Sequence, residues 1–234
     1  MLPKTHNIDA LILCGGLGTR LRPILGDYPK SMADVRGLPL LHILITQTQK
    51  WGFKKFILCI GYQGHIIRQY FKENNAFAGL KILFSEEEKP LGTGGAVKNA
   101  EEKIESDLFL VMNGDTLSEL NMKNFLDFHN KSDSDLTIAL TTKEDKSDYG
   151  NVQLNNSKRI LNFQEKKHHG SGHISMGIYL FNRLILDFIP KGRPYSLEHD
   201  LFPSILDMRC FGYISDATFM DIGTPKRYSR LQKS

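Results

Sequence analysis

Residues 9–20 read DALILCGGLGTR, an apolar segment that passes directly into a glycine-rich loop. A short apolar run that ends in Gly-Gly is typical of a strand buried on both faces of a parallel sheet. Gly15, Gly16 and Gly18 would let backbone N–H groups approach a phosphate chain closely. This stretch therefore predicts a strand followed by a phosphate-binding loop.

Strand-like and helix-like segments alternate through the first two thirds of the chain. The pattern predicts strands at 9–14, 56–60, 81–84, 108–112 and 136–141, and helices at 40–51, 66–71, 96–104 and 125–129. Such alternation implies right-handed crossovers and a mostly parallel sheet with helices on both faces. After Gly150 the segments shorten to 151–154, 160–165 and 173–181, which favours antiparallel strands added to the same sheet. The predicted fold class is α/β and Rossmann-like.

The composition limits the classes of protein to consider. With 234 residues and 41% apolar side chains, the chain can bury one substantial core, so we expect a single domain over residues 1–234. No apolar run approaches the roughly 20 residues that span a bilayer, and no signal peptide is recognisable, which predicts a cytoplasmic protein without a membrane partner. The net charge of +4 comes from scattered Lys and Arg residues, so we expect no nucleic-acid partner. The sequence leaves open whether the chain forms a homodimer.

The spacing of the glycines argues against two common nucleotide-binding motifs. A dinucleotide-binding Gly-x-Gly-x-x-Gly turn counted from Gly16 would need a glycine at Leu21, and no Gly-Lys-Ser or Gly-Lys-Thr closes a P-loop. For the glycines alone, a tight turn that needs positive φ stays an equal alternative. Arg20 and Lys30 follow the loop, and their fixed positive charge favours phosphate binding.

Two aspartates occupy places suited to a metal ion. Asp115 follows the apolar run LFLVM in the string Asn113-Gly114-Asp115, and Asp221 lies in FMDIGTP. Mg²⁺ is commonly held by one or two carboxylates together with phosphate oxygens of a substrate. Either aspartate alone is better explained by a turn or a cap. Together with the glycine-rich loop, the pair predicts Mg²⁺ as the cofactor.

The string Gly-Gly-x-Gly-Thr-Arg-Leu, with Pro23 after it and Pro29-Lys30 at its end, resembles the signature of the sugar nucleotidyltransferases. Further segments match that family in order, and the resemblance extends from about Ala10 to about Tyr228. They are PLGTGGAV, NGD, YG, FQEK and FMDIGTP. The resemblance implies the nucleotide-diphospho-sugar transferase fold and the transfer of a nucleoside monophosphate from an NTP to a sugar 1-phosphate, with release of pyrophosphate.

The resemblance also implies roles for individual residues. Catalysis would rest on Arg20 at the departing pyrophosphate, Lys30 at the NTP phosphates and Asp115, which would hold the metal with Asp221. The residues expected to bind the nucleotide are Leu13, Gly15, Gly16, Gly18, Thr19, Arg20, Glu87, Gly92, Thr93, Asn113 and Gly114. Those expected to bind the sugar phosphate are Tyr149, Gly150, Glu165, Lys166 and Gly177.

The nucleobase of the NTP substrate is predicted from a single residue, Glu87. Glu87 stands five places before Gly92, where relatives that use UTP or dTTP commonly have glutamine. An ionised carboxylate only accepts hydrogen bonds, and guanine offers two adjacent donors, N1–H and the 2-amino group. We therefore expect GTP, with Glu86 and Glu88 as alternatives if the loop shifts by one residue.

The choice of sugar follows from resemblance within the family. The pieces NGDT, YGNV, FQEKK, SLEHDLF and DIGTP are most similar to D-glycero-α-D-manno-heptose 1-phosphate guanylyltransferases. Mannose 1-phosphate or another hexose 1-phosphate stays the alternative substrate. A nucleotide-sugar-binding regulator without activity is the alternative of another class, although such a protein should have lost one of the charged residues. An oxidoreductase is opposed by the glycine spacing.

Overall fold

The computed structural model of the chain describes residues 5–144, 150–164 and 170–233. Within them, a nine-stranded sheet has the order β10-β9-β11-β6-β1-β4-β5, with β8 paired to β11 and β12 paired to β8. The strands are β1 (Asp9–Leu13), β4 (Lys55–Ile60), β5 (Lys81–Glu86), β6 (Leu108–Asn113), β8 (Leu136–Lys143), β9 (Asn151–Leu154), β10 (Ile160–Gln164), β11 (Gly172–Asn182) and β12 (Cys210–Ile214). The strands predicted at 9–14 and 56–60 therefore lie inside the sheet, each with a strand on both sides, as their apolar character predicts.

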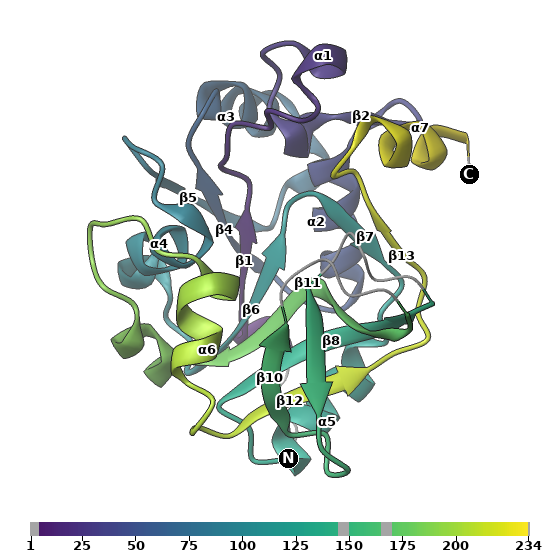
Figure 1. Cartoon of the computed structure of the whole chain (residues 1–234). Helices are drawn as coiled ribbons and strands as arrows, with labels where there is room; N and C mark the ends of the chain where they lie inside the picture. The colour runs from purple at the N-terminus through teal and green to yellow at the C-terminus, as the bar shows by residue number, and fades with distance from the viewer. Residues whose placement is uncertain (1–4, 145–149, 165–169, 234) are drawn as a thin grey trace.

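The sheet is parallel on one side of β6 and largely antiparallel on the other. β1 pairs in parallel with both β4 and β6, and β4 pairs in parallel with β5. β11 pairs antiparallel with β6, β8 and β9. This is the predicted architecture of a mostly parallel core extended by antiparallel strands. The carboxyl ends of β1, β4 and β6 lie at the same edge, where ligands bind in open α/β sheets (Figure 1).

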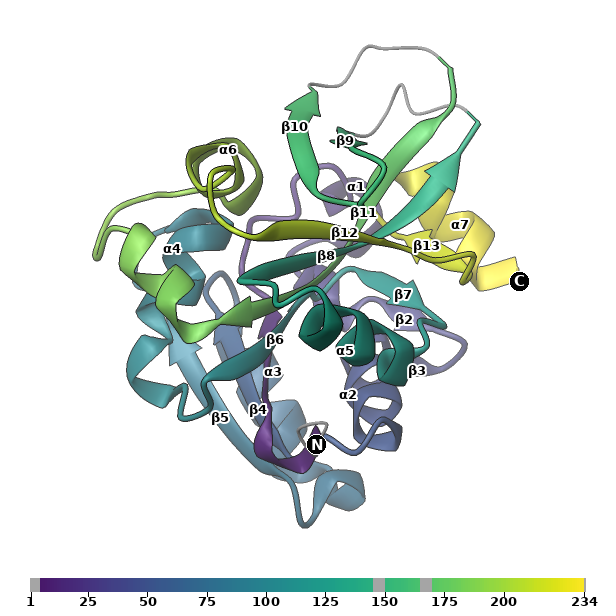
Figure 2. The ribbon, with the colours of Figure 1, turned by 90° about the horizontal axis from the view of Figure 1, so that it is seen from below.

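Helices cover both faces of the sheet. They are α1 (Arg22–Leu25), α2 (Leu40–Lys50), α3 (Gly64–Glu73), α4 (Gly92–Asn99), α5 (Met122–Lys131), α6 (Phe202–Ser204) and α7 (Pro225–Lys233). Ala10 and Ile12 of β1 join a buried cluster with side chains of α2, α3, α5 and α7, whereas Leu11 faces a second cluster with α4 and α6. This alternation follows from the period of two along a strand. Figure 2 shows the chain from below.

Shorter helical turns complete the chain at Thr5–Asn7, Lys30–Met32, Asn75–Phe77, Glu101–Lys103, Arg183–Phe188 and, as a π-helix, Leu197–Leu201. The helix expected at 96–104 begins earlier, at Gly92, and ends at Asn99 before a separate 3₁₀ turn. None of the helices in the described ranges is long and apolar enough to cross a membrane.

Two small ribbons have no counterpart in the sequence-based expectations. β2 (Asp34–Val35) pairs with β3 (Leu38–Pro39), and β7 (Thr116–Ser118) pairs antiparallel with β13 (Phe219–Asp221). Strands of two or three residues are too short to show a hydrophobic period. The partners β7 and β13 are also about a hundred residues apart in the sequence, so only the folded chain shows their pairing.

Candidate active site

The glycine-rich loop leaves β1 at the carboxyl edge of the sheet. Gly16 and Gly18 have φ values of 112° and 56°, which lie in the region that favours glycine. Among the hydrogen bonds of the described residues, none is donated by the backbone N–H groups from Gly15 to Arg20. Thr19 and Arg20 are exposed. The loop therefore presents several unused donors and one guanidinium at this edge, an arrangement suited to phosphate groups.

Asp115 lies beside this loop because of a close approach between β6 and β1. Gly114 donates its N–H to the carbonyl oxygen of Leu13 at 2.9 Å. A Cβ atom on Gly114 would lie 2.6 Å from that same oxygen, so a side chain cannot be placed there without moving the backbone. The next residue, Asp115, forms an ion pair through Oδ2 with Nζ of Lys30. The two charged residues that the sequence analysis assigned to phosphate and metal are thus in contact.

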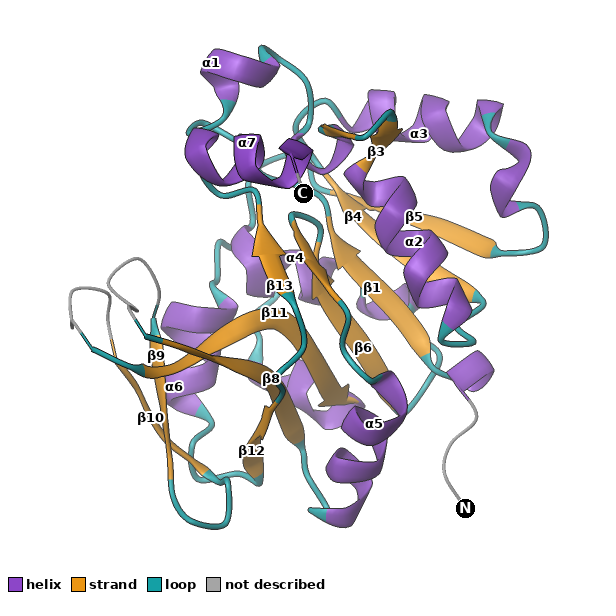
Figure 3. Cartoon of the chain, turned by 90° about the vertical axis from the view of Figure 1, so that its right-hand side faces the viewer, coloured by secondary structure: helices purple, strands orange, loops and turns teal. Residues whose placement is uncertain are grey.

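The β7–β13 ribbon carries Asp221 to the same place. Asp221 is in register with Thr116, and the N–H of Ile222 donates to the carbonyl oxygen of Asp115 at 3.1 Å. The side chain of Asp221 is 10% exposed, and its Oδ1 accepts from the Gly223 N–H at 2.8 Å and from Arg227 at 3.0 Å. Figure 3 shows β13 ending at the same edge as β1 and β6. The backbones of Asp115 and Asp221 are therefore adjacent at the edge that holds the glycine-rich loop.

This pair of carboxylates fits a divalent cation that shares its coordination with a substrate. Within the described ranges no group of three or more His, Cys, Asp or Glu side chains forms a protein cage. Mg²⁺ bound with substrate phosphates needs only one or two carboxylates from the protein. The donor set at Asp115 and Asp221 is consistent with that chemistry.

Asn113 and Gly177 face each other across the β6–β11 pair. Gly177 is buried with a φ of 69°, and a Cβ atom there would lie 2.6 Å from Nδ2 of Asn113. The Oδ1 atom of Asn113 is buried and has no hydrogen-bond partner among the described residues. Buried polar atoms in folded proteins are normally paired, so an acceptor in this position is a candidate for contact with a ligand.

Glu87 lies against the start of the glycine-rich loop. Its Oε1 is 3.0 Å from the place that a Cβ would take on Gly15, and its Oε2 accepts from the Leu91 N–H at 3.0 Å. Burial raises the pKa of this carboxyl, and the hydrogen bond from Leu91 partly offsets that effect. Glu86 is exposed and pairs with Arg68 at 2.7 Å, and Glu88 is also exposed. Of the three neighbouring glutamates, Glu87 is the one beside the loop.

The second glycine-rich segment packs against a chain segment that the sequence analysis did not assign. The N–H groups of Gly94 and Gly95 donate to the carbonyl oxygen of Tyr195 at 2.8 and 3.0 Å. These donors at the start of α4 are therefore satisfied by protein. Thr93 accepts from the Leu197 N–H at 2.8 Å and donates to Glu198 at 2.9 Å.

The sugar-phosphate residues are placed only in part. Gly150 is exposed and directly precedes β9, and Gly177 is the residue opposite Asn113. Tyr149, Glu165 and Lys166 lie outside the described residues. Their assignment therefore stays a prediction.

A model of the family described as "Nucleotidyl transferase" matches residues 9–234 of the chain. The chain belongs to this nucleotidyl transferase family. The resemblance read from the glycine-rich loop and the later motifs is thereby confirmed, and so is the fold class that it implied.

Relatives of this nucleotidyl transferase match over nearly its whole length. A D-glycero-alpha-D-manno-heptose 1-phosphate guanylyltransferase from Aneurinibacillus thermoaerophilus is 37% identical, and the match covers 97% of each chain. A mannose-1-phosphate guanylyltransferase from Mycobacterium tuberculosis is 36% identical over 97% of this chain and 64% of its own. A crystal structure of HddC from Yersinia pseudotuberculosis complexed with GMP-PN has a TM-score of 0.85 and 36% identity, covering 97% of this chain and 98% of that one.

Several residues near the site of this nucleotidyl transferase were not identified from the sequence. Glu198 accepts from Thr93, from Ser196 at 3.2 Å and from the buried Tyr179 at 3.3 Å. It lies in SLEHDLF, a motif that was used for the resemblance without a role for its glutamate. Nothing in the sequence indicated that Arg227 belongs to the site, because most arginines are exposed to solvent.

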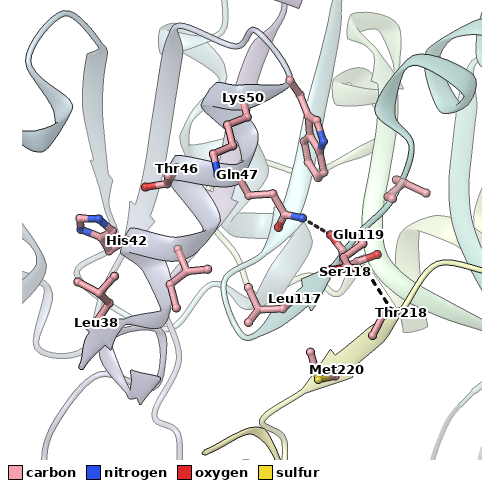
Figure 4. Close-up of a pocket in the computed structure, with 13 residues that line it drawn as sticks. Leu38, His42, Thr46, Gln47, Lys50, Leu117, Ser118, Glu119, Thr218 and Met220 are labelled. Atoms are coloured by element: carbon pink, nitrogen blue, oxygen red, sulfur yellow. Dashed lines mark hydrogen bonds between the residues drawn. The ribbon is translucent and has the colours of Figure 1, made fainter. Parts of the chain in front are cut away.

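The nucleotidyl transferase also has a cavity of about 670 Å³ away from the glycine-rich loop. Figure 4 shows that it lies between α2 and the segments that contain β7 and β13. Its lining includes His42, Gln47 and Lys50 of α2, together with Glu119, and contains none of the residues assigned to nucleotide, sugar or metal. The cavity is thus separate from the candidate active site.

Proposed function

We propose that this chain transfers GMP from GTP to a sugar 1-phosphate and releases pyrophosphate. The observation that carries the proposal is the meeting of three features at one edge of the sheet: unused backbone donors of the glycine-rich loop, the Lys30–Asp115 ion pair and the nearby Asp221. This arrangement suits a reaction between two polyanions, where positioning and charge neutralisation are the main tasks. The curated relatives named as guanylyltransferases support the same activity.

The chemical step needs no general base from the protein. A phosphate oxygen of the sugar 1-phosphate is already ionised, and it attacks the α-phosphorus of GTP in line with the departing pyrophosphate. The exposed guanidinium of Arg20 would hold the pyrophosphate as charge moves onto it, because a planar fork matches two phosphate oxygens. Lys30 would contact the nucleotide phosphates. Both residues stabilise charge that is greatest in the transition state.

Asp115 and Asp221 would hold Mg²⁺ in this reaction. When bound there, the ion would supply positive charge to the phosphates that the two carboxylates cannot supply themselves. Gly114 and the β7–β13 pairing hold these two residues at adjacent backbone positions. The contribution of the chain is therefore the orientation of its two carboxylates.

Glu87 would select guanine. Its position against Gly15 places the carboxylate beside the start of the nucleotide loop, and a carboxylate can accept from both N1–H and the 2-amino group of guanine. Facing uracil or thymine, it would meet a carbonyl oxygen as one acceptor against another. Such a desolvated mismatch costs about 1 to 3 kcal/mol.

D-glycero-α-D-manno-heptose 1-phosphate is the proposed sugar substrate. Two relatives named for that substrate support it, since they are 37% and 34% identical to this chain over 97% and 94% of its length. Tyr149, Gly150, Glu165, Lys166 and Gly177 are proposed to surround the sugar phosphate. Mannose 1-phosphate is the second candidate, since the two sugars differ at a side arm remote from the phosphate. We place the reaction in the cytoplasm, where GTP is made.

Pyrophosphate release tests this proposal directly. GTP, UTP and dTTP are each combined with heptose 1-phosphate, mannose 1-phosphate and glucose 1-phosphate, and kcat/KM is measured for every pair. We expect GTP with heptose 1-phosphate to be the preferred pair, and Glu87→Gln to lose most of the preference for GTP. Glu88→Gln is the matched control, because Glu88 is exposed, and it should retain that preference. A native preference for UTP or dTTP would contradict the assigned base pocket.

A further inference from the structure

Each of the two carboxylates at the active-site edge is paired with a cation from a different element. Asp115 pairs with Lys30, and Asp221 pairs with Nη1 of Arg227 at 3.0 Å. The side chains of Arg227 and Asp221 are 19% and 10% exposed. Solvent and salt screen such a sheltered pair less than they screen a surface ion pair. The positive charges therefore act strongly on whatever approaches the carboxylates.

Arg227 is held in place by the helix that carries it. Thr224 accepts a hydrogen bond from the Arg227 N–H at 3.3 Å, which helps to cap the first turn of α7. The next residue, Tyr228, is buried and donates its hydroxyl to the carbonyl oxygen of Asp34 at 2.7 Å, and Leu231 is buried one turn further. Figure 3 shows α7 at the same end of the molecule as the carboxyl ends of β1 and β13. The guanidinium is thus part of a packed structure.

A guanidinium in this position opposes the entry of a free divalent cation. The incoming ion must approach Asp221 while a fixed positive charge lies against Oδ1 of the same carboxylate. Like charges at such short separation repel strongly in a partly buried site. A nucleoside triphosphate reverses this balance, because its phosphates bring negative charge that both the metal ion and the guanidinium can share.

We propose that Arg227 makes metal uptake depend on the nucleotide, so that Asp115 and Asp221 receive their divalent cation together with the triphosphate and not before it. Arg227 is a positioning residue in this scheme, since it acts on the metal through Asp221. The inference rests on the proposed function for the identity of the two metal ligands. It adds a residue of α7 that neither the motifs nor the glycine-rich loop indicate.

The test is direct binding of Mn²⁺, measured by the loss of the free-ion signal in electron paramagnetic resonance. In the absence of nucleotide, Arg227→Met should bind Mn²⁺ at least tenfold more tightly than the native protein, which corresponds to about 1.4 kcal/mol. Arg227→Lys keeps the charge and should stay within about threefold of the native value. Arg230→Met is the matched control, because it removes the same charge from an exposed position on α7, and it should also behave like the native protein. Adding Asp221→Asn to Arg227→Met should abolish the gain.

Thermal denaturation of each variant shows whether it is folded before its affinity is interpreted. If Arg227→Met does not fold, Arg227→Gln takes its place, since it keeps a donor for Asp221 without the charge, and the same gain is expected. The proposal is overturned if the native protein binds free Mn²⁺ as tightly as the uncharged variant, or if Arg230→Met gives an equal gain. A failure of the proposed function would look different: pyrophosphate release would be absent with every sugar phosphate, whatever the Mn²⁺ affinities.

Discussion

Replacing Gly177 by alanine tests the close contact that holds Asn113 beside the active-site edge. Gly177 is buried at the irregular part of β11, with a φ of 69°, and an added Cβ would meet Nδ2, Cγ and Cβ of Asn113 at 2.6, 2.9 and 3.0 Å. All three distances are at or below the limit of real contacts. Asn113 must therefore move when the methyl group is added.

Two effects lower the free energy of unfolding in Gly177→Ala, namely backbone strain and crowding. In the folded state, a left-handed backbone lowers the free energy of unfolding by roughly 1 to 2 kcal/mol for a residue with a Cβ. Alanine also reduces the conformational entropy of the unfolded chain, which offsets about 0.4 to 1 kcal/mol of that loss. Crowding in a packed interior adds about 1 to 3 kcal/mol. Gly192→Ala isolates the first effect, because Gly192 has a φ of 75° but no atom within 4 Å of an added Cβ. The two variants should therefore differ by about 2 kcal/mol, the crowding effect alone.

The assay compares melting temperatures and turnover. In a protein of this size, about 2 kcal/mol corresponds to a melting temperature lower by about 6 °C. Because Asn113 leads directly into Gly114 and Asp115, Gly177→Ala should also lower kcat by about tenfold to a hundredfold. Gly192→Ala should leave kcat unchanged. Melting within about 2 °C of the control, with native turnover, would refute the contact between Gly177 and Asn113.

Further predictions follow from the remaining charged residues of the site. Asp115→Ala and Asp221→Ala should each lower kcat far more than they raise KM, and native turnover in either variant would exclude it as a metal ligand. Arg20→Ala should lower kcat by orders of magnitude, and Arg20→Lys should restore only part of it; full restoration would mean that Arg20 supplies charge alone. Since burial raises the pKa of Glu87, the carboxylate becomes protonated at a higher pH than an ordinary glutamate, and kcat/KM for GTP should fall as the pH drops through that raised value. Glu87→Gln should remove this fall of kcat/KM at low pH. If the fall persists in the variant, the protonation of another group causes it.

Much of the sheet could be predicted from local patterns. The apolar runs at 9–14 and 56–60 lie in the sheet as β1 and β4, because strands buried on both faces need continuous apolar side chains. The shortened segments after Gly150 were correctly expected as antiparallel additions. The boundaries of α4 were less accurate, since its first turn consists of Gly92 to Gly95, residues that helix propensity disfavours. Tyr195, which accepts hydrogen bonds from this turn, lies about a hundred residues away.

For the candidate site, too, some features could be predicted from the sequence and others are visible only in the tertiary structure. The sequence by itself determined which residue types are present: the glycine-rich loop, Arg20, Lys30 and the two aspartates are the types that the proposed phosphate and magnesium chemistry requires. Only the tertiary structure decided that Asp115 and Asp221 are neighbours, through the three-residue ribbon β7–β13, and that Arg227 lies against Asp221. The physical reason is that local patterns record the period of one element, whereas the adjacency of Asp115 and Asp221 depends on backbone hydrogen bonds between segments far apart in the sequence.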